Sequence, residues 1–212
     1  LSAATDDFCA IVALKCETDF VAKNEGFVAL TKAILDAAVA AKAKSLDEVK
    51  ALEVNGRNVA DLIVEEIGKT GEKMELGAYE WLEGAGTTCY DHLGNKLSCI
   101  ATFTKPVERQ VGRNVAMQIA SMNPISVGRD SVRADVVEKA LEIAREKARQ
   151  EGKKEEMLDK IAQGRLNKFY KESCLLEQEY IMDPALTIEK YLKGVDGDLT
   201  VCAFKRVNLN VD

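Results

Sequence analysis

The sequence predicts an α+β protein with two similar subdomains, each a small antiparallel sheet packed with helices, and an inserted helical hairpin. Three observations predict this class. Short apolar, β-branched runs occur in both halves of the chain, amphipathic segments follow them, and two long charged segments with helical spacing lie next to each other. The chain has 212 residues, of which 47% are hydrophobic and 30% charged, so it can bury a substantial core.

The first half begins with a strand and an amphipathic helix. Residues 8–14, FCAIVAL, form a short apolar run that is typical of a buried strand. Helical spacing starts after Asn24, a residue that favours the N-cap. The apolar positions of this predicted helix fall on one stripe: Phe27, Leu30, Ile34 and Ala38.

Two more helices and a strand are expected before the middle of the chain. Ser45 is a suitable N-cap for the second helix. A third helix is predicted over 57–67, where Gly68 is expected to end it. Residues 73–84 then alternate partly between apolar and polar side chains, which favours a strand.

The second half repeats the order of strand, corner and helix. Strand-like runs at 87–92 and 97–104 are separated by a turn that contains Gly94-Asn95, which predicts a hairpin. An amphipathic helix is expected over 108–122 and should end at Asn123-Pro124. The last run, 200–211, predicts a closing strand.

The segments 131–149 and 153–173 predict the helical hairpin. Residues 150–152, Gln-Glu-Gly, separate them. The first segment has a heptad-like seam at Val137, Leu141, Ala144 and Ala148, and the second places Leu158, Ile161, Leu166 and Phe169 inward. This pattern predicts a short antiparallel coiled coil. Such an arm could pack on its own domain or contact another chain, including a second copy in a homodimer.

Four segments follow from this organisation. The N-terminal core subdomain is predicted over 1–84 and the first part of the C-terminal core subdomain over 85–130. The coiled-coil hairpin is predicted over 131–173, and the closing part of the C-terminal subdomain over 174–212.

Composition excludes several classes of function. The net charge of −6 and the pI of about 5.1 argue against a broad nucleic-acid surface. No apolar run approaches the roughly 20 residues that a membrane span needs. The first residues, LSAATDD, lack the layout of a secretory signal and an initiator Met, so we expect a piece of a longer chain. Six dispersed cysteines without a C-x-x-C pair indicate a reduced, cytoplasmic protein.

The residues of an enzyme active site are largely missing. His92 is the only histidine, which excludes a His-pair metal site. Gly68-Lys69-Thr70 is not a P-loop, because Ile63 stands where the motif requires glycine. We therefore expect no metal, no cofactor and no catalytic residues. A hydrolase that uses His92 with Cys89 is kept as a rival hypothesis.

The stretch KCETDFVAKNEGF, residues 15–27, places a large aromatic side chain at a strand–helix corner. Corners are usually polar. An apolar residue ahead of a helix can pack back on it as a hydrophobic staple, and Val21 or Phe20 could do this. Alternatively, Phe20 could be an anchor for a partner, because an aromatic ring on a rigid corner has few rotamers to freeze on binding.

Several motifs together resemble bacterial translation elongation factor Ts. They are TDFV within KCETDFVAKNEGF, the hairpin residues YDHLGN, VAMQIASMNP at 115–124, GRLNKFYKESCLLEQEYIMDP at 164–184, and TIEKYLK. The motifs occur in the family's order and cover nearly the whole chain. The resemblance implies two core subdomains, a coiled-coil arm, and the absence of the family's N-terminal helical module.

The resemblance also implies a function. Family members are guanine-nucleotide exchange factors for the GTPase elongation factor Tu and promote GDP release. By position, the stretch that dislocates the GTPase magnesium is Thr18, Asp19, Phe20 and Val21. Second contacts on the GTPase are implied for His92, Ala116, Met117, Ile119 and Ala120. The alternative is a coiled-coil dimerisation or scaffold protein without exchange activity.

Overall fold

The computed structural model describes residues 1–210. The chain divides into two compact units, which are described separately. The first unit combines Leu1–Ala120 with the chain from Val201 onward, and the second is Ser121–Thr200. Among residues 1–210, no helix combines the length and the apolar character needed to cross a membrane.

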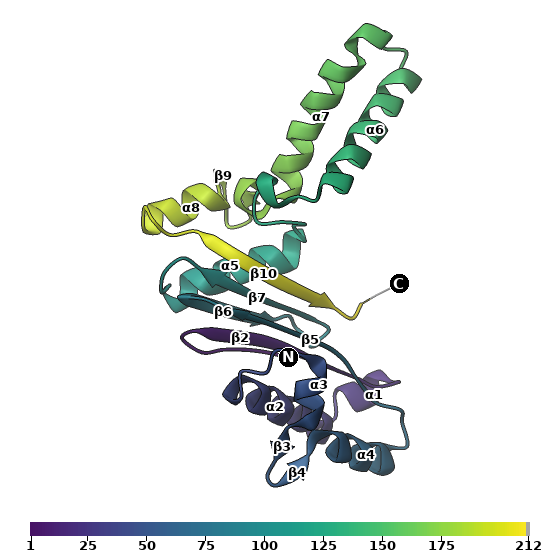
Figure 1. The fold of residues 1–212 in the computed structure, drawn as a ribbon, viewed down its shortest axis with the longest axis vertical. Coiled ribbons are helices and arrows are strands. Elements are labelled where there is room, and N and C mark those ends of the chain that lie inside the picture. Colours follow the sequence, from purple (N-terminus) through teal and green to yellow (C-terminus); the bar gives the residue numbers. More distant parts are fainter. Residues whose placement is uncertain (211–212) are drawn as a thin grey trace. The chain divides into compact units, whose positions relative to one another are not determined.

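Two three-stranded antiparallel sheets form the centre of the first unit (Figure 1). The first sheet has the order β1-β2-β5, with β1 at Ser2–Ala4, β2 at Phe8–Lys15 and β5 at Glu75–Glu83. The second has the order β10-β7-β6, with β6 at Gly86–Asp91, β7 at Leu97–Phe103 and β10 at Val201–Asn208. The α+β class with small antiparallel sheets is therefore confirmed. The end of the predicted last strand, at residue 211, lies outside the described residues.

The first sheet has helices on one face and the second sheet on the other. The helices are α1 (Asp19–Ala22), α2 (Glu25–Ala40), α3 (Leu46–Ala51) and α4 (Val59–Thr70), and a two-stranded ribbon, β3 (Glu53–Val54) with β4 (Arg57–Asn58), precedes α4. Side chains of β2 such as Phe8, Ala10 and Val12 pack against Ile34 of α2 in one apolar core. The alternate β2 residues Cys9 and Ile11 pack instead against Ile100 of β7. Strand β2 is therefore buried on both faces, which explains its continuous apolar run.

The predicted N-caps of two helices hold, but both bounds of the helix predicted over 57–67 were wrong. Asn24 caps α2 by accepting hydrogen bonds from the backbone of Gly26 and Phe27, and Ser45 caps α3. Residues 57 and 58 form strand β4, and Asn58 caps α4, which begins at Val59. Helix α4 continues through Gly68 to Thr70, and Gly71, with a left-handed φ of 73°, caps its C-terminus. Gly68 does not adopt the positive φ that a glycine at a helix C-terminus usually has, and the helix therefore continues past it.

The second sheet carries the predicted hairpin and packs against helix α5 (Arg109–Met122). The turn between β6 and β7 places Gly94 at φ 92° and Asn95 at φ 57°, as the Gly-Asn pair predicted. A Cβ added to Gly112 of α5 would lie 3.0 Å from Thr88 of β6, so the missing side chain allows this close approach. The face of α5 with Val115 and Ile119 is fully buried.

The second unit contains the predicted helical hairpin. Helix α6 (Ala134–Gln150) packs along α7 (Leu158–Ser173), and small residues such as Ala144, Ala148 and Ala162 are buried between them. The ends differ from the prediction because short 3₁₀ turns at 129–131 and 155–157 precede the two helices. Ile161 and Phe169 are only half-buried, whereas Leu158 and Leu166 are buried as predicted. The unit also contains the β8–β9 pair (Glu179–Tyr180 with Asp183–Thr187) and α8 (Ile188–Val195).

Candidate functional site

The TDFV stretch forms a one-turn helix at the end of β2. Helix α1 has four residues and none of them is buried. Thr18 is its N-cap, and the Thr18 hydroxyl accepts a hydrogen bond from the Val21 backbone N–H at 3.4 Å. We call residues 18–21 the tip. Because so short a helix has almost no internal stabilisation, contacts with other segments must hold its conformation.

The Phe20 side chain points into solvent, with 91% of its surface exposed. Its neighbour Val21 is half-buried and packs against the core of the first sheet and its helices. The staple interpretation therefore does not apply to Phe20. A large apolar ring this exposed gains nothing from folding and keeps its full apolar surface available.

A carboxylate from a distant loop holds the start of the tip. Glu72 follows Gly71 at the end of α4 and accepts hydrogen bonds from the backbone N–H groups of Glu17 and Thr18, both at 3.0 Å. Its second oxygen accepts a short hydrogen bond from the Thr18 hydroxyl. The bond from Thr18 and those from the backbone lower the pKa of the Glu72 carboxyl below its ordinary value. In return, the Glu17 carboxylate accepts a hydrogen bond from the Lys73 backbone at 3.1 Å.

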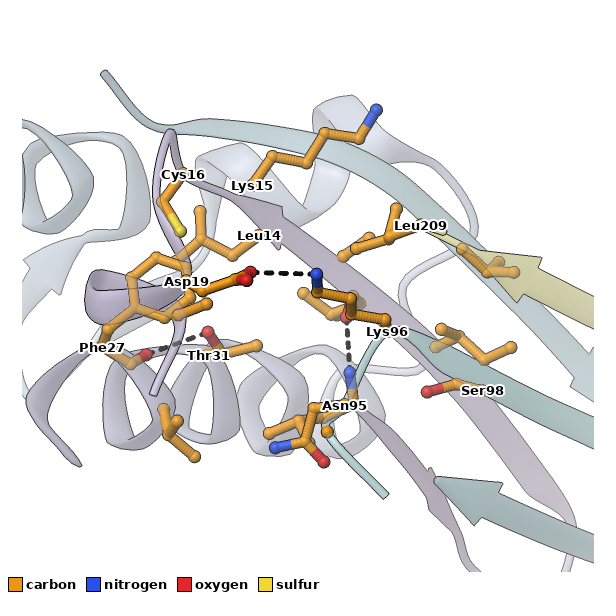
Figure 2. A pocket seen from close by; sticks show the side chains of 18 of the residues that line it. Leu14, Lys15, Cys16, Asp19, Phe27, Thr31, Asn95, Lys96, Ser98 and Leu209 are labelled. Carbon is orange, nitrogen blue, oxygen red and sulfur yellow. Dashed lines mark hydrogen bonds and ion pairs between the residues drawn. The ribbon is translucent and has the colours of Figure 1, made fainter. Parts of the chain in front are cut away.

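An ion pair connects the tip to the β6–β7 turn. Figure 2 shows the Asp19 carboxylate directed at the Lys96 ammonium, with 2.9 Å between Oδ1 and Nζ. The hydrogen bond and the charge of Lys96 lower the pKa of Asp19 below its ordinary value. Both side chains are largely exposed, so water screens the pair and it contributes orientation more than stability.

A cavity of about 320 Å³ lies beside this ion pair (Figure 2). Its wall includes the end of β2, the Asp19 side of the tip, Phe27 and Thr31 of α2, and the turn at Asn95 and Lys96. The tip therefore borders a cavity on its Asp19 side. Val21 packs on the core, and Glu72 and Lys96 supply the polar contacts that hold the rest of the tip.

The second predicted contact, His92, stands at the end of the hairpin that carries Lys96. Its ring is exposed, and its Nδ1 lies 3.0 Å from the Tyr90 hydroxyl. The next residue, Leu93, is 95% exposed. The fold thus connects the tip and the β6–β7 turn through the Asp19–Lys96 pair, although the two segments are far apart in sequence.

The remaining predicted contacts lie on α5 and are mostly internal. Ala116 and Ile119 have no exposed surface, and Ala120 is 5% exposed. Only Met117 is half-buried. These residues therefore pack α5 into the core of its unit, and a direct contact with another protein can involve only Met117 among them.

Comparison with known proteins identifies the family. The family model described as Elongation factor TS matches residues 17–210. The elongation factor Ts of Porphyromonas gingivalis is 53% identical over 213 residues, which cover all of this chain and 78% of the relative. That of Azobacteroides pseudotrichonymphae is 49% identical with the same coverage, and that of Amoebophilus asiaticus is 45% identical over 207 residues, 96% of this chain and 75% of the relative. The chain belongs to the elongation factor Ts family.

Membership in this family assigns the chain to protein biosynthesis, as a nucleotide exchange factor for elongation factor Tu in translation elongation. The hydrolase hypothesis has no support from the site. Burial raises the pKa of the Cys89 thiol, which is the opposite of what a nucleophilic thiolate needs. Among residues 1–210, no cluster of three or more His, Cys, Asp or Glu side chains could hold a metal.

Two residues of the candidate site were not found by sequence reasoning. Glu72 lies 54 positions after Thr18, and Lys96 lies in the turn between β6 and β7 of the other sheet. Neither position carries a local signal, because surface Glu and Lys are common next to turns. Strand β2 pairs with β5, and this long-range pairing brings the segment before β5 next to Thr18. The contact of Glu72 with the tip therefore becomes visible only in the folded structure.

Proposed function

We propose that this elongation factor Ts chain releases GDP from elongation factor Tu by inserting Asp19 and Phe20 next to the GTPase's magnesium and nucleotide site. Thr18 and Val21 frame these two residues. The observation that carries the proposal is the exposure of the Phe20 ring, 91%, on a tip that Glu72 and Lys96 hold in place. The chain itself supplies position and charge, and breaks no covalent bond.

The energetics of exchange require a preference for one state of the GTPase. The factor and GDP must weaken each other's affinity by the same ratio, and equally tight binding to both states would release nothing. Burial of the Phe20 side chain in a gap that opens only in the nucleotide-free GTPase would contribute about 2–3 kcal/mol. That energy corresponds to a preference on the order of a hundredfold.

Asp19 adds an electrostatic contribution. Magnesium neutralises the phosphates of a bound nucleotide, so displacement of the ion lowers the affinity for GDP. An anionic carboxylate close to the ion site disturbs the metal's water ligands and their hydrogen bonds. In the free factor Lys96 lies against this carboxylate, lowers its pKa and directs it toward the β6–β7 turn.

Further contacts are proposed at some distance from the tip. His92, exposed on the turn that holds Lys96, would contact the nucleotide domain of the GTPase. On α5, Met117 would reach the partner, while the buried Ala116, Ile119 and Ala120 keep the helix in place.

The rest of the chain has a supporting role in this proposal. The α6–α7 hairpin is proposed to be the family's antiparallel coiled-coil arm, with the core subdomains divided near residue 84. We place the factor in the cytoplasm with elongation factor Tu. Contact of the arm with a second copy of the chain stays a prediction, which light scattering of the purified factor over a range of concentrations would test.

Stopped-flow release of fluorescent GDP from elongation factor Tu tests the proposal. The chain at micromolar concentration should accelerate release. Saturating GDP should weaken the equilibrium affinity of the factor for the GTPase by the same ratio by which the factor weakens the affinity for GDP. A chain that binds the GTPase without changing the release rate would contradict exchange and support the scaffold alternative.

A further inference from the structure

We propose that Glu72 is a positioning residue for exchange, which holds the tip in its binding geometry before the GTPase arrives. The inference rests on the proposed function of the tip. Glu72 itself is not part of the TDFV stretch and need not touch the partner.

The geometry around Glu72 is that of a clamp. One carboxylate takes three hydrogen bonds from two consecutive residues, Glu17 and Thr18, immediately before the tip. The Thr18 hydroxyl donates a hydrogen bond to Glu72 and accepts one from the Val21 N–H. The second bond closes the turn that presents Phe20. A single side chain therefore fixes both the approach of the chain and the N-cap of α1.

The clamp is needed because the tip has few other restraints. Helix α1 is a single turn whose Val21 is half-buried against the core, and a cavity adjoins it on the Asp19 side. Residues 17 and 18, which precede the helix, are held by the hydrogen bonds to Glu72. Without Glu72, the backbone at 17 and 18 would adopt many conformations, and only a fraction of the molecules would present the ring correctly. The apparent affinity falls by that fraction.

The hydrogen bonds between Glu72 and residues 17 and 18 do not require a negatively charged side chain at position 72. In Glu72→Gln, the amide oxygen can accept from the two backbone N–H groups and the amide NH₂ can donate to the Thr18 hydroxyl. The Gln variant therefore keeps a hydrogen-bonded clamp, whereas Glu72→Ala removes all three bonds. This difference separates positioning from a general loss of an acidic residue.

The test measures GDP release from elongation factor Tu at subsaturating factor for four chains. Glu72→Ala should lower the acceleration about tenfold. Glu72→Gln should stay within about threefold of the unchanged chain. Glu75→Ala is the matched control, because Glu75 is an exposed carboxylate on the adjoining strand and makes no hydrogen bond to the tip in the described part of the chain. It should have no effect.

A second arm places Glu72→Ala in a Phe20→Ala background. If Glu72 acts by positioning Phe20, Glu72→Ala should lower the acceleration of GDP release only slightly in a chain that already lacks the Phe20 ring. Hydrogen exchange of the amides of residues 17 and 18 should be faster in Glu72→Ala, and the melting temperature should change by no more than about 2 °C, since the clamp is at the surface.

The outcomes separate the two proposals. An unchanged chain that does not accelerate GDP release overturns the proposed function and this inference with it. An active chain whose Glu72→Ala variant is equally active, or loses the same factor with and without Phe20, overturns this inference alone.

Discussion

Phe20→Ala is the substitution that most directly tests the exchange mechanism. The ring is 91% exposed, so its removal costs almost no buried surface in the free factor. Alanine also has a higher helix propensity than phenylalanine. The free energy of unfolding should therefore stay within about 0.5 kcal/mol of the unchanged chain, and the melting temperature within about 2 °C. In the complex, the lost burial is worth about 2–3 kcal/mol, so GDP release at subsaturating factor should slow about 30- to 150-fold.

The assay is stopped-flow release of fluorescent GDP together with thermal unfolding, and the chain offers two matched comparisons. Val64→Ala removes another exposed apolar side chain, 65% exposed on α4, and should change neither measurement. Phe27→Ala makes the same chemical change at a buried position, 5% exposed, and should cost about 3–5 kcal/mol of stability. The reasoning is refuted if Phe20→Ala unfolds the factor as Phe27→Ala does, or if it leaves the rate of release unchanged.

Three further predictions concern the surroundings of the tip and the sheets. Lys96→Ala should leave the melting temperature unchanged and raise the pKa of Asp19 toward its ordinary value, which NMR titration would follow. The small stabilisation of the folded state by this ion pair is present above the ordinary pKa of Asp19. It is lost as the pH falls through the lowered pKa of the folded protein. His92→Ala should weaken binding to nucleotide-free elongation factor Tu about fivefold by calorimetry, without a change in thermal stability, and an unaltered affinity would exclude the β6–β7 turn from the interface. Gly86→Ala should lower the free energy of unfolding, measured in urea, by about 1–3 kcal/mol, because the new Cβ would lie 2.2 Å from the Lys105 carbonyl oxygen. Gly68→Ala should raise this free energy by up to about 1 kcal/mol, because Gly68 is within α4 and a Cβ there would meet no other atom within 4 Å.

Sequence reasoning predicted the elements that local chemistry determines. The apolar run 8–14 became β2, and the N-caps Asn24 and Ser45 start their helices because each side chain accepts from the backbone of the first turn. The Gly94-Asn95 turn forms because both residues tolerate a positive φ. Each of these features depends on residues within a few positions of one another.

The errors arose where two local signals competed or where a contact is long-range. Gly68 and Gly71 are both plausible helix ends, and only Gly71 takes the left-handed conformation. The motif implies partner contacts for α5, whereas the helical periodicity buries Ala116 and Ile119 in the core, so a direct contact stays a prediction for Met117 alone. The exposure of Phe20 could not be decided from sequence either, since Val21 next to it is an equally good candidate for packing on the core.

The tip illustrates how a short segment acquires a defined shape without a core of its own. Its four residues cannot maintain one turn of helix by themselves. Val21 packs on the core, and two further restraints come from a carboxylate after α4 and an ammonium on the β6–β7 turn. Both restraints are polar and lie at the surface, so they hold the backbone without covering the ring. An apolar clamp would have stabilised the tip more strongly, but it would have used the surface that Phe20 needs for its target. Because Glu72 and Lys96 restrain the tip through polar groups, the Phe20 ring can be exposed and oriented at the same time.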